Sequence, residues 1–467
     1  MKTQRNRTLL RPSSPLIALV LASALLALPS YAQNLYLKGG KLVDPETRTI
    51  REEPLLIVDG RIQDPGELPK GFQTNFKGEI VDVEGRWIIP GLVDLHTHAA
   101  INTGPGGVSE FLGTEILARR MLYNGVTAFL DLFNDENYIL ELRDRQRRDG
   151  IPATADIFAA GACLTSTDGH GTEYPIPARI MDSPADAKRQ VDKLAAKMPD
   201  VIKIIYHNMT EQDLTWREFM PTIDKKTFRA AVQAAKRHGI PTVVHIGSWQ
   251  DARDAVEVGA DAVTHLPHQT EVPADVVKLF AESGTWIIPS LPDISFMDDP
   301  ELRSSELVRS STTQAVLDAY TTFAATENGA YMSRGMNASE PRLFKSLKAL
   351  IDAGARIATG TDSGNTLTVH GFSMHRQLAL MVEAGLDPWV ALATSTVHAG
   401  DFLKRDYGLS PGDEGSVVVL DGSPIEDITQ TQKIHLVVHH GVVLDRDELK
   451  AKPNEFWADP PRPSPLD

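Results

Sequence analysis

Residues 88 to 98 read Ile-Ile-Pro-Gly-Leu-Val-Asp-Leu-His-Thr-His, and this stretch decides how the rest of the chain is interpreted. Its apolar part predicts a buried strand that Pro90-Gly91 interrupts near the start. Side chains alternate along a strand, so His96 and His98 point to the same side of a sheet. Two imidazoles at one strand end can bind zinc or a related first-row cation, but two surface histidines would show the same spacing. Ligands elsewhere in the chain must decide between these interpretations.

The region from 88 to 402 alternates short apolar segments with amphipathic ones. Predicted strands span 88–95, 126–130, 153–160, 201–205, 242–245, 262–265, 286–289 and 357–361. Predicted helices between them span 113–123, 185–197, 226–238, 249–258, 274–283 and 342–353, and glycines follow several of them as C-caps. Eight strands with intervening helices predict an α/β fold of the (β/α)8 TIM barrel type. A doubly wound open sheet shares this alternation, but no Gly-x-Gly-x-x-Gly follows the first strand.

The two ends of the mature chain differ from the region 88–402, because their sequence predicts short strands joined by tight turns. Residues 55–58 precede Asp59-Gly60, and residues 416–420 precede Asp421-Gly422. We therefore predict that residues 33–87 and 403–452 together build one small β-sandwich domain, followed by a proline-rich tail at 453–467. A polar, partly helical insertion at 293–340 follows the seventh strand, and a lid and a simple surface insertion both fit it.

The first 32 residues have the features of a cleavable signal peptide. Four basic residues precede an apolar run at 16–28, and Ser30-Tyr31-Ala32 fits the cleavage rule. The apolar run is shorter than the ~20 residues of a spanning helix. We therefore expect cleavage before Gln33, a periplasmic or secreted protein, and no stable membrane insertion after the leader is removed.

Composition narrows the range of partners and metal sites. The net charge of −15 argues against binding to nucleic acid or to an anionic membrane surface. Cys163 is the single cysteine, which excludes an internal disulfide and a cysteine-based zinc site. This composition is compatible with a small-molecule substrate, and the sequence leaves open whether the chain forms a homo-oligomer.

Further candidate ligands stand at the ends of other predicted strands. His245, His265 and Asp362 end strands five, six and eight, at the face where barrel active sites lie. Lys203 lies inside strand four, where a buried ammonium costs several kcal/mol unless it is paired or neutralised. Carboxylation by carbon dioxide would turn it into an anionic ligand, while an ion pair with an acid in the barrel is the simpler alternative. Four histidines and an aspartate at strand ends together predict a metal site.

These motifs resemble the amidohydrolase superfamily of metal-dependent hydrolases over nearly the whole mature chain. The segments at 370–385 and 420–428 resemble the branch of imidazolonepropionase-related proteins and prolidase-like dipeptidases. The resemblance implies two divalent metal ions, most naturally Zn2+, that share a bridging hydroxide. It places His96, His98 and Asp362 on one metal and His245 and His265 on the other, with a carboxylated Lys203 bridging both.

The resemblance also implies roles for residues around the metals. Asp362 would take the proton of the hydroxide and deliver it to the leaving nitrogen. His170, in Asp168-Gly169-His170-Gly171, would contact the substrate, although a glycine is usual at position 168. Tyr206 and His207 could donate to a developing oxyanion, and His268, His370 and His375 are weaker candidates for the pocket.

The expected function is hydrolysis of an amide-type C–N bond in a dipeptide, an N-acyl amino acid or a cyclic amide. A lactone or ester hydrolase is the alternative enzyme, because the same hydroxide attacks any activated carbonyl. A catalytically inactive periplasmic binding protein is the alternative that is not an enzyme. Deamination ranks low, because Ile246-Gly247-Ser248 stands where deaminases typically carry an acidic residue.

Overall fold

The computed structural model describes residues 34–66, 72–107, 109–150, 153–207, 220–291, 298–452 and 466. The predicted signal peptide, and all of the predicted tail except residue 466, lie outside these described residues. Within the described part of the chain, no helix has the length and apolarity needed to cross a bilayer.

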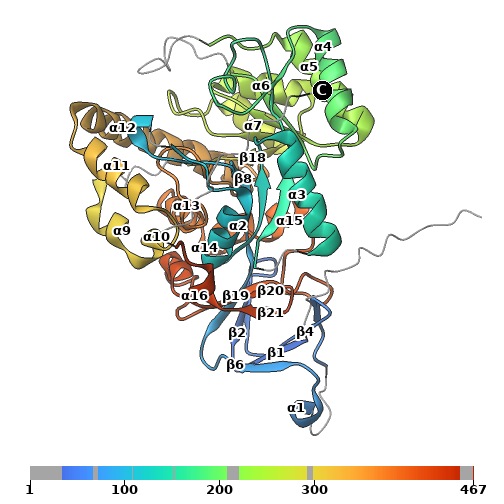
Figure 1. Ribbon diagram of the computed structural model, residues 1–467, viewed down its shortest axis with the longest axis vertical. Helices are drawn as coiled ribbons and strands as arrows, with labels where there is room; N and C mark the ends of the chain where they lie inside the picture. Colours follow the sequence, from blue (N-terminus) through green and yellow to red (C-terminus); the bar gives the residue numbers. More distant parts are fainter. Residues whose placement is uncertain are drawn as a thin grey trace, which may run out of the picture.

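Both ends of the described chain contribute strands to one end of the molecule (Figure 1). A four-stranded sheet has the order β5-β4-β1-β6, and a six-stranded sheet has the order β21-β20-β19-β7-β2-β3. Apolar side chains from both sheets form one core. The strands are β1 (Leu35–Lys38), β2 (Lys41–Asp44), β3 (Thr49–Arg51), β4 (Leu55–Val58), β5 (Arg61–Gln63), β6 (Glu79–Asp82), β7 (Trp87–Pro90), β19 (Val417–Leu420), β20 (Ile434–His439) and β21 (Val442–Leu444).

The stretch predicted as one strand at 88–95 is two strands in different sheets. β7 pairs antiparallel with β19, whereas β8 (Leu92–Thr97) pairs in parallel with β11 (Val126–Asp131). Gly91 separates them, and a Cβ at this position would lie 2.1 Å from Thr127 Oγ1. The chain therefore passes from the end sheets to the central sheet at a point that only glycine can occupy without displacing its neighbour.

The central region is an α/β arrangement of parallel strands. One sheet has the order β12-β11-β8, and another has the order β14-β13-β15-β16-β17-β18. The remaining strands are β12 (Asp156–Ala159), β13 (Leu164–Thr165), β14 (Arg179–Ile180), β15 (Ile202–Ile205), β16 (Thr242–His245), β17 (Ala262–Thr264) and β18 (Trp286–Ile288), with a short antiparallel pair of β9 (Asn102–Thr103) and β10 (Ser109–Glu110).

The segment predicted as the eighth strand is irregular. Single parallel bridges join Ile357 to Ile287 and Ser363 to Thr97. The backbone N–H of Asp362 donates to the His96 carbonyl at 2.7 Å. Gly360 lies so close to the first strand that a Cβ there would be 2.6 Å from His96 Cβ. This close approach brings Asp362 beside His96 without a regular ladder.

Helices connect and cover the parallel strands (Figure 1). Gly239, Gly259 and Gly284 end three of them in left-handed conformation, which confirms the C-caps predicted there. The helix at 136–149 was not predicted, because its sequence is strongly polar and offers only a narrow apolar face. The helices of this part are α2 (Thr114–Tyr123), α3 (Glu136–Asp149), α4 (Pro184–Ala195), α5 (Lys225–His238), α6 (Trp249–Val258), α7 (Ala274–Ser283), α13 (Phe372–Glu383), α14 (Pro388–Thr394) and α15 (Val397–Leu403).

The described part of the insertion is helical and lies on one side of the molecule (Figure 1). Tyr320 and Met332 from these helices form an apolar cluster with Leu367 and Phe372. The helix predicted at 342–353 is the last part of a longer one that contains Pro341. The helices are α9 (Pro300–Ser304), α10 (Glu306–Arg309), α11 (Gln314–Ala324) and α12 (Glu327–Asp352), and the short elements elsewhere are α1 (Phe72–Asn75), η1 (Pro105–Gly107), η2 (Ile428–Gln432) and α16 (Arg446–Leu449).

Candidate metal centre and active site

All six predicted metal ligands line one cavity of about 410 Å³ at the carboxyl ends of the parallel strands. Three of them lie in the strands β8, β15 and β16. The other three lie just past β8, just past β17 and at the end of the irregular eighth segment. Parallel strands that end at one edge bring residues distant in sequence together. The residues are His96, His98, Lys203, His245, His265 and Asp362.

Asp362 is the centre of the closest group of these side chains. Its Oδ1 lies 3.1 Å from His96 Nε2 and 3.0 Å from His98 Nε2. The His265 ring centroid is 5.0 Å from that of His96 and 4.5 Å from that of His245. Ligand atoms of His96, His265 and Asp362 all lie within 4.8 Å of one another, the arrangement of a group that can bind one cation.

Two of these residues have strained backbone conformations. His265 has a φ of 74° and Asp362 a φ of 61°, in the left-handed region that residues other than glycine rarely adopt. Each conformation costs on the order of 1 kcal/mol or more, and such strain clusters at functional sites. Hydrogen bonds from the His265 N–H to the Ile288 carbonyl and from the Asp362 N–H to the His96 carbonyl hold both turns.

Burial gives the histidines the protonation state that metal binding needs. It lowers the pKa of His96 and His245 well below the usual value, and that of His265 to about 3. Neutral imidazole keeps a lone pair for a cation. Burial alone would raise the pKa of Asp362, but its contacts with His96 and His98 outweigh this and hold the pKa below its usual value. The site therefore offers neutral nitrogen ligands and an ionised carboxylate.

Lys203 is a buried amine with incomplete compensation for its charge. It is 2% exposed, and its Nζ donates a hydrogen bond to the neutral Thr264 hydroxyl at 3.1 Å. Burial lowers the pKa of Lys203 to about 8. Near neutral pH a fraction of the side chain is therefore the free amine, which is the form that reacts with carbon dioxide.

His170 lies in the cavity, as the resemblance implied. Its ring centroid is 4.8 Å from that of His245, and Glu173 Oε1 contacts its Nδ1 at 2.6 Å. The contact with Glu173 therefore uses Nδ1 of the ring and not Nε2. The residue is thus placed on the wall of the cavity beside the predicted second metal.

Tyr206 does not reach this cavity, and its predicted role as an oxyanion donor is corrected. Its hydroxyl donates to Asp254 Oδ2 at 2.7 Å, and its ring stacks on Phe228 at 4.3 Å. Tyr206 follows the strand residue Ile205, so it points to the helix layer. The next residue, His207, points inward instead, with its Nδ1 3.0 Å from His245 Nε2.

The three other histidine candidates lie outside the group of residues that line the cavity. His370 is buried beside it, with Nε2 3.3 Å from the His98 carbonyl. His375 is buried in α13, and His268 is exposed. Only His370 therefore contacts the site, through the backbone of a predicted ligand.

Besides Thr264, the partner of Lys203, sequence reasoning missed two polar residues whose side chains contact the predicted ligands. Ser290 Oγ lies 2.9 Å from His96 Nδ1, and Asn365 Nδ2 donates to Asp362 Oδ1 at 2.9 Å. Partners of this kind orient a ligating side chain. Ser290 directly follows the strand predicted at 286–289, so its position after a predicted strand end is the signal that could have found it.

One wall of the cavity is apolar. Phe133 and Ile205 pack with Cys163, and Tyr174 and Ile176 pack against them. Cys163 is 1% exposed, so it is a small buried residue of this wall. This wall can hold an apolar part of a substrate beside the polar group of ligands. None of the described residues 298–352 lines the cavity, so the described insertion does not act as its wall.

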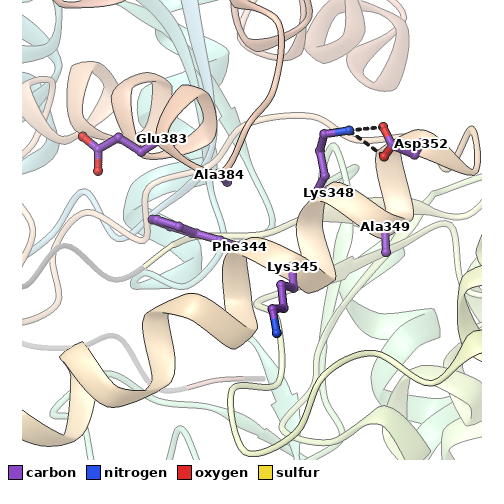
Figure 2. A pocket seen from close by; sticks show the side chains of 7 residues that line it. All are labelled: Phe344, Lys345, Lys348, Ala349, Asp352, Glu383 and Ala384. Carbon is purple, nitrogen blue, oxygen red and sulfur yellow. Dashed lines mark hydrogen bonds and ion pairs between the residues drawn. The ribbon is translucent and has the colours of Figure 1, made fainter.

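A second hollow lies at the surface between α12 and α13 (Figure 2). Lys348 and Asp352 pair with each other along α12, and Glu383 points away from them. Its polar groups do not converge on a common point, so this hollow lacks the chemistry of the cavity above.

Comparisons with known proteins identify the family of this chain. The sequence model of the amidohydrolase family matches residues 87–444. Ochratoxinase from Aspergillus niger is 24% identical over 477 residues, which cover 92% of this chain and 90% of that protein.

Solved structures share the fold. A Xaa-Pro dipeptidase with bound methionine has a TM-score of 0.69 at 20% identity and covers 88% of this chain and 100% of its own. A putative prolidase from Bifidobacterium longum has a TM-score of 0.67 at 20% identity, covering 90% and 98%. Because the family model spans most of the sequence, the chain belongs to the amidohydrolase family. Members of this family are metal-dependent hydrolases that act on carbon–nitrogen bonds.

Proposed function

We propose that this protein hydrolyses an amide-type C–N bond in a small molecule such as a dipeptide, an N-acyl amino acid or a cyclic amide. The observation that carries the proposal is the convergence of all six predicted ligands in one cavity of a chain that matches the amidohydrolase family. The chain's similarity to ochratoxinase and to prolidase-like structures supports an amide-type substrate.

The donor set fits two divalent cations. His96, His98 and Asp362 would hold one, His245 and His265 would hold the other, and Lys203 would lie between them. Neutral imidazoles and an ionised carboxylate suit Zn2+. When bound, the two cations would polarise the substrate carbonyl and lower the pKa of a water molecule.

Lys203 is proposed to be carboxylated. The neutral amine nitrogen would form a bond to the carbon of carbon dioxide and release one proton, which leaves an anionic carbamate. A side chain that starts as the ammonium cation first loses one further proton. The lowered pKa of Lys203 and the absence of charge on its partner Thr264 support this conversion. An anion at this position would balance the charge of two cations in a site that has one other carboxylate among its six predicted ligands.

The chain's own residues supply proton transfer and substrate positioning. Asp362 is ionised and adjoins His96 and His98, so its carboxylate can accept a proton from the attacking water and pass it to the leaving nitrogen. His170 and His207 line the same cavity and can contact the substrate carbonyl or its substituents. The wall formed by Phe133, Tyr174 and Ile176 would take an apolar side chain.

We also propose that the parallel strands close into a (β/α)8 barrel and that the two end sheets form a β-sandwich. The bridges from Ile357 to Ile287 and from Ser363 to Thr97 support closure, and the shared apolar core supports the sandwich. Export to the periplasm rests on the signal peptide features of the sequence, and intact-mass measurement of exported protein starting at Gln33 would check it.

A substrate panel tests the proposed reaction. Metal-replete protein is incubated with dipeptides, N-acyl amino acids, cyclic amides and lactones, and product formation is followed. Turnover of a C–N substrate with loss of activity in Asp362→Asn, while metal remains bound, would support the proposal. Turnover of lactones alone would assign an ester-type hydrolase, and an inert metal-replete protein would indicate a binding function.

A further inference from the structure

A second group of metal-ligating side chains lies between β12 and the end of β20. We propose that Asp156, His439 and His440, with Glu414 beside them, form a binding site for a first-row divalent cation such as Zn2+, separate from the candidate active site. The cation would join the sheet built from the chain ends to the central parallel sheet.

The ligand atoms already converge. Asp156 Oδ1 lies 2.9 Å from His440 Nε2 and 3.5 Å from His439 Nε2, and ligand atoms of all three residues lie within 4.8 Å of one another. The side chains are 20%, 13% and 9% exposed, in that order. Two imidazoles and a carboxylate are the ligand types of zinc sites. The group therefore has the composition and spacing of a partial coordination shell.

The orientation of His439 fits a ligand. Its Nδ1 lies 3.2 Å from Ser416 Oγ, which also accepts the backbone N–H of His440 at 3.1 Å. If Nδ1 carries the ring proton and donates it to this oxygen, Nε2 keeps a free lone pair that faces Asp156. Metal-binding histidines commonly donate their second nitrogen in this way.

Glu414 provides the second, independent observation. Its side chain is 2% exposed, and its Oε2 is buried and has no hydrogen-bond partner, whereas Arg405 contacts Oε1. The Gly441 N–H donates to the Gly415 carbonyl at 2.8 Å, which places Glu414 next to the end of β20. A buried carboxylate oxygen that lacks a hydrogen-bond partner, next to a group of two imidazoles and a carboxylate, favours an added cation.

The group lies at the opposite end of the strands from the candidate active site. Asp156 pairs with Ala128, and Ala128 pairs with Val93, which precedes His96 by three residues. At about 3.3 Å per residue, this places Asp156 roughly 10 Å from the level of His96 along the strands. A cation here would not touch the substrate, so its effect is on stability.

An ordinary ion pair is the competing explanation. A protonated His440 could neutralise Asp156 by itself, and Arg405 already partly neutralises Glu414. That explanation leaves the buried Glu414 Oε2 without a partner. It also predicts no response of the folded protein to added metal at this place, which separates the two explanations.

The test compares metal content and thermal stability in the full-length mature protein. Wild type and the double variant His439→Gln/His440→Gln are stripped with a chelator, reloaded with excess Zn2+, desalted and analysed by elemental mass spectrometry. We expect the double variant to bind one equivalent less than wild type and to lose part of the Zn2+-dependent rise in Tm. Its kcat should stay within about twofold of wild type.

His435→Gln is the matched control, since His435 lies on the same strand, is 35% exposed and pairs with Asp421. It should keep the wild-type metal content. Asp156→Asn gives the same comparison if the double variant does not fold. Equal metal content in wild type and variants, or an equal loss of Tm with and without Zn2+, would overturn the proposal. Because the comparison counts bound metal, it gives an answer even if no amide substrate is found.

Discussion

Replacing Tyr206 by phenylalanine separates a packing role from a catalytic one. The variant keeps the ring that stacks on Phe228 and removes only the hydroxyl that donates to Asp254 at 2.7 Å. Asp254 would still accept hydrogen bonds from Lys225 Nζ at 2.8 Å and Gln250 Nε2 at 2.9 Å. Asp254 therefore keeps two hydrogen-bond donors, and the expected loss of stability is about 1.5 kcal/mol, the lower end of the range for a hydrogen bond to a charged group.

The assay measures thermal unfolding and steady-state kinetics on the same preparation. We expect a small decrease in Tm, of no more than about 2 °C for a chain of this length, with kcat/KM within about twofold of wild type. Loss of an oxyanion donor instead lowers kcat by about 100- to 1,000-fold. A decrease of that size at unchanged Tm would refute the placement of Tyr206 in the helix layer.

A pH series and a matched variant strengthen this test. Burial and the charge of Asp254 raise the pKa of Tyr206 above its usual value. A tyrosine of raised pKa stabilises the fold below about pH 10 and loses this contribution as the unfolded chain ionises above it. The stability difference between wild type and Tyr206→Phe should therefore shrink above pH 10. The control Tyr174→Phe makes the same chemical change on the cavity wall and should alter KM or kcat more than Tm.

Two further predictions concern residues that position the ligands. Ser290→Ala removes the partner of His96 Nδ1, so we expect metal affinity to fall about 10- to 100-fold with little change in Tm of the chelated protein; unchanged affinity by competition with a chelating dye would contradict this. Gly360→Ala would place a Cβ 2.5 Å from Ile288 Cγ2 and 2.6 Å from His96 Cβ, so kcat should fall more than about tenfold. Gly335→Ala is its control, because a Cβ there meets no atom within 4 Å and alanine favours a helix; equal activity in both variants would refute the argument.

Patterns local in sequence predicted much of the fold. Periodicity and capping signals placed most of the central strands and helices. A buried strand shows as a short apolar run, and a helix end shows as a glycine that can adopt the left-handed conformation, so both are recognisable within a few residues. The helix at 136–149 was not predicted, and the irregular structure of the eighth segment was not predicted either. The helix is mostly polar, and the segment is held by single bridges to distant strands rather than by its own pattern.

The sequence by itself determined which side chains are available for metal chemistry, because a histidine or aspartate at a strand end is visible in the chain. It could not determine which of the two residues after the strand that carries Lys203 faces the cavity. Tyr206 and His207 are adjacent and both polar, and both lie past the end of β15, so only the folded structure shows that the tyrosine contacts Asp254 and the histidine contacts His245. Tertiary structure alone also brought Asp156 to His439 and His440, more than 280 positions away, because β12 and β20 belong to different sheets that meet only in the folded protein.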